Sequence, residues 1–517
     1  MADRKEAITE QRQTKLQRLH SRSIDPYPPR YPRTHSIRDA IALFQQLEGN
    51  KEEAPHIRVA GRIMAQRGMG KASFIDIRDG SGKIQAYFRK DAIGEEKYQF
   101  LHDFDTGDFI GVSGKVFRTK SGEVTVEVSD FAMLSKSLQP LPEKWHGLTD
   151  VEKRYRQRYL DLISNDEARH IFTMRSRIIA AMRSFLDERG FIEVETPVLL
   201  PVASGAMARP FSTYHNVLDQ TLYMRIATEL YLKRLIIGGL DKVYEIGRIF
   251  RNEGISAKHN PEFTMMESYE AYADYNDVMA MLEEMVCYIA RDVSSTLEFS
   301  FGDNTVNLTT PWRRVSFRDE LNKRCGVDFL DDKYRDIASL QEAMGRLGME
   351  AESGVSWGHL IDKLFSTYVE PHLIQPTFVL DYPVELSPLA KGKPGEPRLV
   401  ERFECFMGGM EFANAFTELN DPVEQRKRFE EQERLRATLG DEEVERLDED
   451  FLLAMEYGMP PTGGLGVGID RLVMILTNQQ SIREVILFPQ LKIRPEGIPS
   501  EQKFGDHKVS RGDKADA

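Results

Sequence analysis

A short polar segment between two strand-like runs is the feature that most constrains how this chain folds. The runs KVYEIGRIF (242–250) and FTMMESYEAYA (263–273) alternate in polarity, and the segment between them turns at a Gly-Ile-Ser sequence. Alternation with a period of two predicts β-strands, and a short polar connection between two strands predicts a hairpin. The chain is therefore expected to contain an antiparallel pair of strands with an elaborate turn at one end.

The side chains of this hairpin are unusual for a turn, because ordinary turns use Gly, Asn, Asp and Pro. A guanidinium binds phosphate through its planar fork, carboxylates bind metals or amino groups, and an aromatic ring offers a face to a purine. The set indicates a site for a nucleoside triphosphate beside an amine. The alternative is a solvated hairpin whose charges pair with one another. The residues concerned are Arg251, Glu253, His259, Glu262, Phe263 and Glu267.

A second segment, GGLGVGIDRLVMILTN (463–478), places alternating glycines before an apolar helical run that opens with Asp470 and Arg471. Small residues allow a backbone to approach a ligand closely, and an arginine at a helix start can meet an anion. Close packing of a helix on a sheet would explain the glycines equally well. The order of residues is neither the dinucleotide pattern nor GxxxxGK[ST], so the nucleotide site is not of the Rossmann or P-loop type.

These two segments resemble motifs 2 and 3 of class II aminoacyl-tRNA synthetases. The strings RNEGIS-KHNPEFTMME, ATELYLK (227–233) and NAFTELND (414–421) resemble lysyl-tRNA synthetases in particular. A helix predicted over 177–189, closed by Gly190 and followed by the strand FIEVETPVLL, resembles motif 1. The chain departs from the usual pattern at Thr228, which replaces a proline, and at Ala415 and Thr417, which replace glycine and serine.

The resemblance covers roughly 56–492 and implies an α+β fold. An N-terminal OB-fold β-barrel would be followed by a class II catalytic domain with an antiparallel sheet flanked by helices. Independently, about five short strands within 56–137, with DGSGK and KSGE as hairpin turns, suit a small β-barrel. The expected parts are a helical extension (1–55), the OB-fold anticodon-binding domain (56–140), a linker (141–165), the catalytic domain with a helical insertion (166–492) and a disordered tail (493–517).

Length and composition predict a globular protein with more than one domain. The 517 residues are 41% hydrophobic and 29% charged, which is typical of soluble globular proteins. No apolar run approaches about 18 residues, so no membrane span is predicted and a cytoplasmic location is expected. The three cysteines lack metal-binding spacing, which predicts reduced packing residues and no zinc.

The net charge of −13 is unevenly distributed. The first 33 residues carry eight Lys or Arg against four acids, whereas 424–450 is strongly acidic with a helical pattern. A local basic surface can contact phosphate while the rest of a protein repels non-specific nucleic acid. A solvated helix face is the alternative interpretation of the basic segment.

The chemistry that the resemblance implies begins with attack of the lysine carboxylate on the α-phosphate of ATP. The products, lysyl-adenylate and pyrophosphate, would be followed by transfer of lysine to the 3′ end of tRNA(Lys). Because the carboxylate is already ionised at neutral pH, catalysis needs positioning and charge neutralisation rather than a general base. Arg251 would bind the α-phosphate and Arg471 the γ-phosphate, and Phe263 would stack on adenine. The implied ATP-binding set is Arg251, Glu253, His259, Asn260, Phe263, Glu404 and Arg471.

The resemblance also implies the metal and the amino-acid site. Glu404 and Glu411 match the family's ligands for Mg²⁺, a metal that prefers oxygen; two exposed acids on a strand are the alternative. No organic cofactor is expected. The implied lysine-binding residues are Gly205, Glu229, Glu267, Tyr269, Asn414, Phe416 and Glu418. Three carboxylates suit a substrate with two ammonium groups.

Within this set, the family pattern implies which residue meets which part of lysine. Glu229 and Gly205 would take the α-amino group. The residues around the ε-ammonium group would be Glu267, Tyr269 and Glu418. Asn414 and Arg251 would meet the carboxylate.

In the barrel, the family pattern implies that Phe74 stacks on an anticodon base and that Gln85 reads a base edge, with Arg62 and Glu123 as helpers. The alternatives are that Phe74 belongs to the barrel core and that Gln85 is an ordinary exposed residue. Motif 1 forms the dimer interface in the family, so an apolar helix face over 178–186 predicts a homodimer.

Two other functions remain possible at this point. Truncated relatives of the same catalytic domain lysylate a protein rather than tRNA, but they lack the N-terminal barrel. A non-catalytic RNA-binding paralogue is the second alternative. The joint presence of Arg251, Glu404, Glu411 and Arg471 argues against it.

Overall fold

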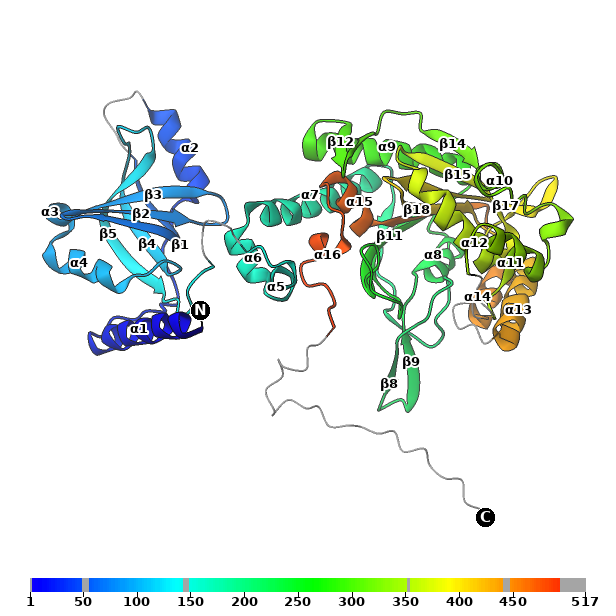
Figure 1. The fold of residues 1–517 in the computed structure, drawn as a ribbon, viewed down its shortest axis with the longest axis horizontal. Coiled ribbons are helices and arrows are strands. Elements are labelled where there is room, and N and C mark those ends of the chain that lie inside the picture. Colours follow the sequence, from blue (N-terminus) through cyan, green and yellow to red (C-terminus); the bar gives the residue numbers. More distant parts are fainter. Residues whose placement is uncertain (1, 49–54, 143–147, 351–353, 440–446, 493–517) are drawn as a thin grey trace, which may run out of the picture. The chain divides into compact units, whose positions relative to one another are not determined.

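The computed structural model describes residues 2–48, 55–142, 148–350, 354–439 and 447–492 (Figure 1). Contacts divide the chain into two units, Met1–Thr149 and Asp150–Ala517, and each is described by itself. The expected linker is split by this division, because helices over 151–164 belong to the second unit. The expected disordered tail lies outside the described residues.

The first unit is a closed five-stranded barrel with strand order β1-β2-β3-β5-β4, which confirms the OB-fold expectation. Its strands alternate between a buried apolar face and an outer face: Ile75 and Ile77 enter the core, whereas Phe74 remains half-buried outside it. The elements are α1 (Ala2–Ser21), α2 (Ile37–Leu47), β1 (His56–Met69), β2 (Ala72–Arg78), β3 (Lys83–Arg89), α3 (Lys90–Ile93), α4 (Glu95–Phe100), η1 (Leu101–Asp103), β4 (Phe109–Arg118) and β5 (Val124–Ser135).

Basic residues of α1 hold this helix on the barrel. Lys15 pairs with Asp105 at 2.7 Å, and Arg18 pairs with Asp103 at 2.9 Å. The buried Arg12 donates hydrogen bonds to the carbonyl oxygens of Thr106 and Gln139 at 2.9 and 2.8 Å. These three cations therefore serve intramolecular packing, a role that the sequence analysis did not consider.

The second unit is built on a nine-stranded sheet with order β14-β15-β17-β18-β19-β11-β10-β6, in which β16 also pairs with β17. The predicted hairpin is present: β10 and β11 pair in antiparallel register, from Lys242 opposite Glu270 to Phe250 opposite Glu262. The strands are β6 (Ile192–Glu193), β10 (Lys242–Phe250), β11 (Glu262–Ala271), β14 (Arg313–Ser316), β15 (Thr377–Pro383), β16 (Gly392–Lys393), β17 (Glu396–Met407), β18 (Met410–Thr417) and β19 (Thr462–Gly468).

Helices cover the two faces of this sheet. One face packs against α7 (Asp166–Glu188), α9 (Tyr275–Ser294) and α15 (Ile469–Leu476), which share the largest apolar core with it. On the other face, α8 (Glu229–Ile237) packs through Leu232 and Ile236 against Val243 and Tyr269. Because successive strand residues point to opposite faces, the odd-numbered residues of β11 from 263 to 269 share the α8 side.

The remaining elements of the second unit surround this framework. Asp274 and Asp277 form a capping box that begins α9, and Ser316 caps α10. The elements are α5 (Val151–Arg156), α6 (Arg158–Ser164), β7 (Leu199–Leu200), β8 (Ser212–His215), β9 (Gln220–Met224), β12 (Glu298–Phe301), β13 (Asn304–Asn307), α10 (Phe317–Cys325), η2 (Asp332–Tyr334), α11 (Ile337–Arg346), α12 (Trp357–Tyr368), η3 (Glu370–His372), η4 (Val384–Leu386), α13 (Pro422–Leu439), α14 (Glu449–Glu456) and α16 (Ile482–Val485).

Motif 1 differs from its expected form in two respects. The helix begins at Asp166 rather than near 177, because the Asn165 side chain accepts a hydrogen bond from the Glu167 N–H and caps it there. The expected strand FIEVETPVLL consists of two short strands, β6 and β7, which belong to different sheets.

The apolar helix face over 178–186 is not a surface. Ile178, Met182 and Leu186 are fully buried in the core that α7 shares with α9 and the sheet. The assignment of this face to a dimer interface was therefore wrong. The three cysteines are free thiols, and none of the described helices has the length and apolar character needed to cross a membrane.

Candidate active site

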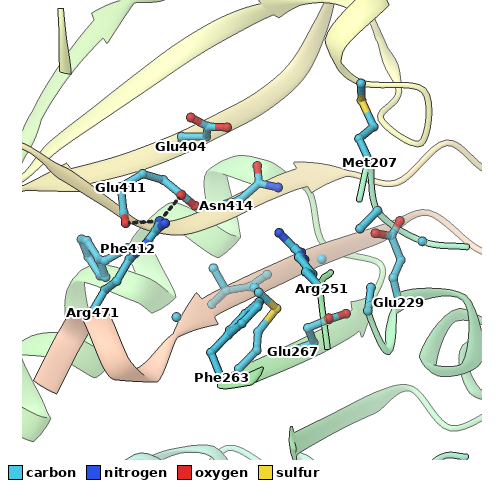
Figure 2. Close-up of a pocket in the computed structure, with 18 of the residues that line it drawn as sticks. Met207, Glu229, Arg251, Phe263, Glu267, Glu404, Glu411, Phe412, Asn414 and Arg471 are labelled. Carbon is cyan, nitrogen blue, oxygen red and sulfur yellow. Dashed lines mark hydrogen bonds and ion pairs between the residues drawn. The ribbon is translucent and has the colours of Figure 1, made fainter. Parts of the chain in front are cut away.

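A cavity of about 410 Å³ opens on the α8 side of the sheet, above β11, β18 and β19 (Figure 2). All fifteen residues that the sequence analysis assigned to ATP, lysine and Mg²⁺ line it. They come from segments that are far apart in sequence, and the hairpin, the β17–β18 pair and the start of α15 each contribute. The sequence assignments are thus brought together in one place.

The glycine-rich strand β19 forms the floor of the cavity. Gly464, Gly466 and Gly468 line it on alternate positions. A Cβ atom at Gly464 would overlap the Glu418 carboxylate and would lie 2.7 Å from the ring of Tyr269. The absence of a side chain at Gly464 is therefore needed by the cavity itself, and helix packing alone does not explain these glycines.

Two arginines mark one end of the cavity. The hairpin closes where the Arg251 N–H donates to the Pro261 carbonyl oxygen at 2.8 Å, and the Arg251 guanidinium lies 5.2 Å from the Phe263 ring centroid. Figure 2 shows Arg251 pointing into the cavity between Glu267 and Asn414. This end therefore offers a half-buried cation beside an aromatic face.

Arg471, at the start of α15, forms an ion pair with Glu411. Its guanidinium also lies 3.3 Å from Nε2 of His259, whose Nδ1 is 2.8 Å from the Ser256 hydroxyl. Burial and, after it, the nearby Arg471 lower the pKa of His259, which favours the neutral imidazole at pH 7. His259 is thus a neutral polar group that supports Arg471.

Glu404 and Arg402 face the cavity together from β17. The Glu404 carboxylate accepts hydrogen bonds from Arg402 at 2.6 Å and from the Tyr382 hydroxyl at 2.8 Å. Burial raises the pKa of Glu404 to about 7, although Arg402 acts in the opposite direction. Arg402 also donates to the Asn414 side chain at 2.9 Å. The sequence analysis missed Arg402, although its spacing of two residues from Glu404 on a strand placed both on one face.

The donor set of this end fits Mg²⁺ that is shared with a triphosphate. Glu404 and Glu411 line the cavity from neighbouring strands, β17 and β18. Mg²⁺ is usually held by one or two carboxylates, with phosphate and water oxygens as its other ligands. Throughout the described ranges, no three or more His, Cys, Asp or Glu side chains are grouped so that they could hold a metal by themselves.

Asn260 and Glu253 both line the cavity from the hairpin. Asn260 is buried, and its amide donates to the Glu262 carbonyl oxygen at 2.6 Å and accepts from the Gln490 N–H at 3.3 Å. The amide nitrogen thus bonds within the hairpin, and the amide oxygen ties the hairpin to the chain near 490. Glu253 lines the cavity from the exposed part of the hairpin turn.

The other end of the cavity is acidic and buried. The Glu267 carboxylate accepts hydrogen bonds from the Thr228 N–H at 3.1 Å and from the Tyr269 hydroxyl at 3.3 Å. Burial, and then repulsion from Glu229, raise the pKa of Glu267 to about 7. The proline that usually precedes Glu229 in the family pattern has no N–H, so the hydrogen bond from Thr228 is a consequence of this departure.

A lysine that the sequence analysis missed lies behind this acidic end. Lys233 is fully buried, and its Nζ is 2.5 Å from Glu229 and forms a second ion pair with Glu418. A spacing of four residues on a predicted helix could have indicated the first contact. No sequence signal connected Lys233 with Glu418.

In the first unit, the structure contradicts the two structural alternatives, namely that Phe74 belongs to the barrel core and that Gln85 is an ordinary exposed residue. Phe74 lies on the outer face and stacks on Tyr87 with ring centroids 4.6 Å apart, so it is not barrel core. Gln85 is buried rather than exposed, and its amide donates to the Glu123 carboxylate at 2.8 Å. Arg62 donates to the Gly107 carbonyl oxygen at 2.8 Å, so this proposed helper is occupied within the barrel.

Comparison with known proteins agrees with this architecture. The family model described as tRNA synthetases class II (D, K and N) matches residues 150–492, and the model described as OB-fold nucleic acid binding domain matches residues 57–134. A lysine–tRNA ligase from Dehalococcoides mccartyi is 57% identical over 494 residues, which cover 95% of this chain and 98% of that protein. One from Bacillus subtilis is 51% identical over 485 residues, covering 93% and 97%. The chain therefore belongs to the class II tRNA synthetases (D, K and N).

Proposed function

We propose that the chain is a lysine–tRNA ligase, which uses ATP to activate L-lysine as lysyl-adenylate and transfers the lysyl group to the 3′ end of tRNA(Lys). The observation that carries this proposal is one cavity with two chemically different ends. Two guanidinium groups and an aromatic ring lie at one end, and three buried carboxylates lie at the other. Such a cavity matches a triphosphate joined to an amino acid that has two ammonium groups.

In the first step, a carboxylate oxygen of lysine attacks the α-phosphorus of ATP and pyrophosphate leaves. Arg251, from the hairpin, points into the cavity between Glu267 and Asn414 and would neutralise the charge that develops on the α-phosphate oxygens. Arg471 would bind the far end of the triphosphate, and Phe263 would stack on adenine. Glu404 and Glu411 would hold Mg²⁺, which would supply further charge neutralisation.

In the second step, a terminal ribose hydroxyl of the tRNA attacks the carbonyl carbon of the adenylate and AMP leaves. Specificity for lysine follows from the acidic end. Glu229 would bind the α-amino group, and Glu267, Tyr269 and Glu418 the ε-ammonium group. A smaller or neutral amino acid would leave buried carboxylates without partners, which is energetically costly.

Lysine-dependent exchange of pyrophosphate into ATP tests the first step, and charging of tRNA(Lys) tests the second. We expect both activities with lysine and neither with aspartate or asparagine, which lack a second ammonium group. Exchange without tRNA charging would support the ligase with a protein acceptor. Absence of exchange would support a non-catalytic RNA-binding protein.

Three further features belong to this proposal. The outer face of the barrel around Phe74 would read the anticodon, with Gln85 held in place by Glu123.

The protein would act as a homodimer in the cytoplasm, where its substrates are found. Large apolar residues that remain exposed after α7, at 192, 198 and 199, support an interface there in place of the buried helix face.

A further inference from the structure

The buried lysine behind the acidic end touches two of its three carboxylates. Lys233 lies on α8 one turn after Glu229, and its side chain has no solvent exposure. Its Nζ is 2.5 Å from the Glu229 carboxylate and also forms an ion pair with Glu418, which comes from the chain just after β18. Glu229 and Glu418 line the cavity, whereas Lys233 is not one of the lining residues. The lysine therefore stands behind the wall and contacts the cavity only through these two acids.

The charges around this end balance only when the substrate is counted. Glu229, Glu267 and Glu418 are all buried, and a buried charge is tolerated only when it is paired. Lys233 supplies one ammonium group, and a bound lysine would supply two more. Three carboxylates would then face three ammonium groups, while the carboxylate of the substrate would meet Arg251 and Asn414 at the other side.

The surroundings of Lys233 keep its ammonium group charged and in place. Burial lowers the pKa of Lys233, but Glu229 and Glu418 together outweigh burial, so that its pKa is raised overall. The ring centroids of Phe416 and Phe451 lie 5.4 and 6.0 Å from its Nζ, within the range of cation–π attraction. Lys233 contacts Oε2 of Glu418, whereas Oε1 has no hydrogen-bond partner within the described part of the chain, so Oε1 can receive a hydrogen bond from a ligand.

We propose that Lys233 is a positioning residue for both ammonium groups of the substrate, because it pairs with Glu229 and Glu418 at the same time and orients both carboxylates at the cavity wall. This inference rests on the proposed function. It differs from the assignment of the acids themselves, because it couples the recognition of the α-amino and ε-ammonium groups through a residue that touches neither. A residue that served only the packing of α8 would not produce this coupling.

The test uses the full-length chain, with Lys233→Met and Lys233→Gln, in pyrophosphate exchange. Both variants remove the charge, and the second keeps a hydrogen-bond donor. We expect the KM for lysine to rise by about tenfold or more, as for loss of charge-assisted hydrogen bonds, while the KM for ATP stays within about twofold. An equal rise in both KM values, or a fall in kcat alone, would overturn the proposal.

Two lysine analogues distinguish recognition of the α-amino group from recognition of the ε-ammonium group. Norleucine lacks the ε-amino group and 6-aminohexanoate lacks the α-amino group, and each is used as an inhibitor competing with lysine. In the Lys233 variants the inhibition constants of both should rise. In Glu418→Gln only that of 6-aminohexanoate should rise, and in Glu229→Gln only that of norleucine. If the inhibition constant of only one analogue rises in the Lys233 variants, the coupling is contradicted.

Lys136 offers a matched control. It is a fully buried lysine in the first unit and contacts two carboxylates, at 2.5 Å from Asp105 and 2.8 Å from Asp108. Lys136→Met should lower the melting temperature without changing the KM for lysine. If neither Lys233 variant folds, the residue is structural and the proposal is overturned. If the unaltered protein shows no lysine-dependent exchange, the proposed function itself fails, which is distinguishable from a failure confined to the Lys233 variants.

Discussion

At the level of single side chains, removal of the Glu267 charge should weaken the binding of lysine without weakening the binding of ATP. It lies on β11 at the acidic end of the cavity, away from Arg471 and Glu404 (Figure 2). Glu267→Gln removes one charge that faces the ε-ammonium group. Because a charge-assisted hydrogen bond contributes about 1.5–3 kcal/mol, the KM for lysine should rise roughly tenfold to hundredfold, with the KM for ATP almost unchanged.

The control for this substitution is Glu270→Gln on the same strand. Glu270 pairs with Lys242 at 2.6 Å and does not line the cavity, so its variant should exchange pyrophosphate normally. If Glu267→Gln raises the KM values for lysine and ATP equally, Glu267 does not bind the side chain of the substrate.

The pKa of the same carboxyl predicts how lysine binding depends on pH. Burial first, and then Glu229, raise the pKa of Glu267 to about 7, so the neutral acid predominates below pH 7 and must lose its proton before it can pair with an ammonium group. The KM for lysine should therefore increase as pH falls, by about tenfold between pH 8 and pH 6. The raised pKa values of Glu229 and Glu418 act in the same direction.

Pyrophosphate exchange at a series of pH values measures this effect. The dependence should be weaker in Glu267→Gln, which has one titrating group fewer. Because the pKa of Glu404 is also raised to about 7, the KM for ATP must be followed separately. A KM for lysine that is constant from pH 6 to pH 8 in the unaltered protein would contradict the prediction.

At the level of elements, the outer face of the barrel strands can be tested apart from the barrel core. Phe74, on β2, stacks on Tyr87 of β3 and remains half-buried outside the core. Phe74→Ala should weaken tRNA charging by an amount that corresponds to loss of one stacked base, about 1–3 kcal/mol. Lysine-dependent pyrophosphate exchange should not change, because no residue of the barrel lines the cavity.

Phe88 provides the contrasting case in the neighbouring strand. It is fully buried, and Phe88→Ala should reduce the stability of the barrel by about 3–5 kcal/mol, which a melting curve would detect. Phe74→Ala should melt close to the unaltered protein. Normal tRNA charging by a folded Phe74→Ala variant would refute the anticodon role proposed for this residue.

At the level of the whole molecule, the division into two units predicts a division of labour. Every residue that lines the cavity belongs to the unit Asp150–Ala517. Deletion of residues 1–149 should leave lysine-dependent pyrophosphate exchange largely intact, while charging of tRNA falls steeply. Circular dichroism controls for the folding of the shortened chain. Loss of exchange by a folded product would show that the barrel takes part in adenylate formation.

The proposed homodimer is tested by the mass in solution. Ile192, Val198 and Leu199 expose between 38% and 49% of their surface, whereas Ile178, Met182 and Leu186 of α7 are buried. Light scattering should give twice the chain mass of 59.3 kDa, and the pair Ile192→Glu and Leu199→Glu should shift the mass toward the monomer. An active, dilute monomer of the unaltered chain would exclude the dimer as a requirement.

Part of the site could be predicted from residue spacing, because several of its groups lie at regular spacings within single segments. Alternation along β10 and β11 predicted the hairpin, and the glycine alternation along β19 indicated a close approach of the backbone. The resemblance to class II synthetases then placed fifteen residues that all line one cavity. Arg402 could have been found in the same way, since it precedes Glu404 by two residues on a strand.

What the tertiary structure alone decided concerns partners that are distant in sequence. The pairing of Lys233 with Glu418, of Arg18 with Asp103 and of Gln85 with Glu123 depends on how separate elements pack. Periodicity likewise marked the apolar face of α7 but could not say whether another helix or a second copy covers it. The sequence by itself determined most of the chemical groups that the cavity contains, because local period and residue type mark the hairpin and the glycine-rich strand, and the resemblance to class II synthetases implies the others. Their partners, and hence their charge states, follow only from packing, which brings remote residues within a few ångströms and removes water from between them.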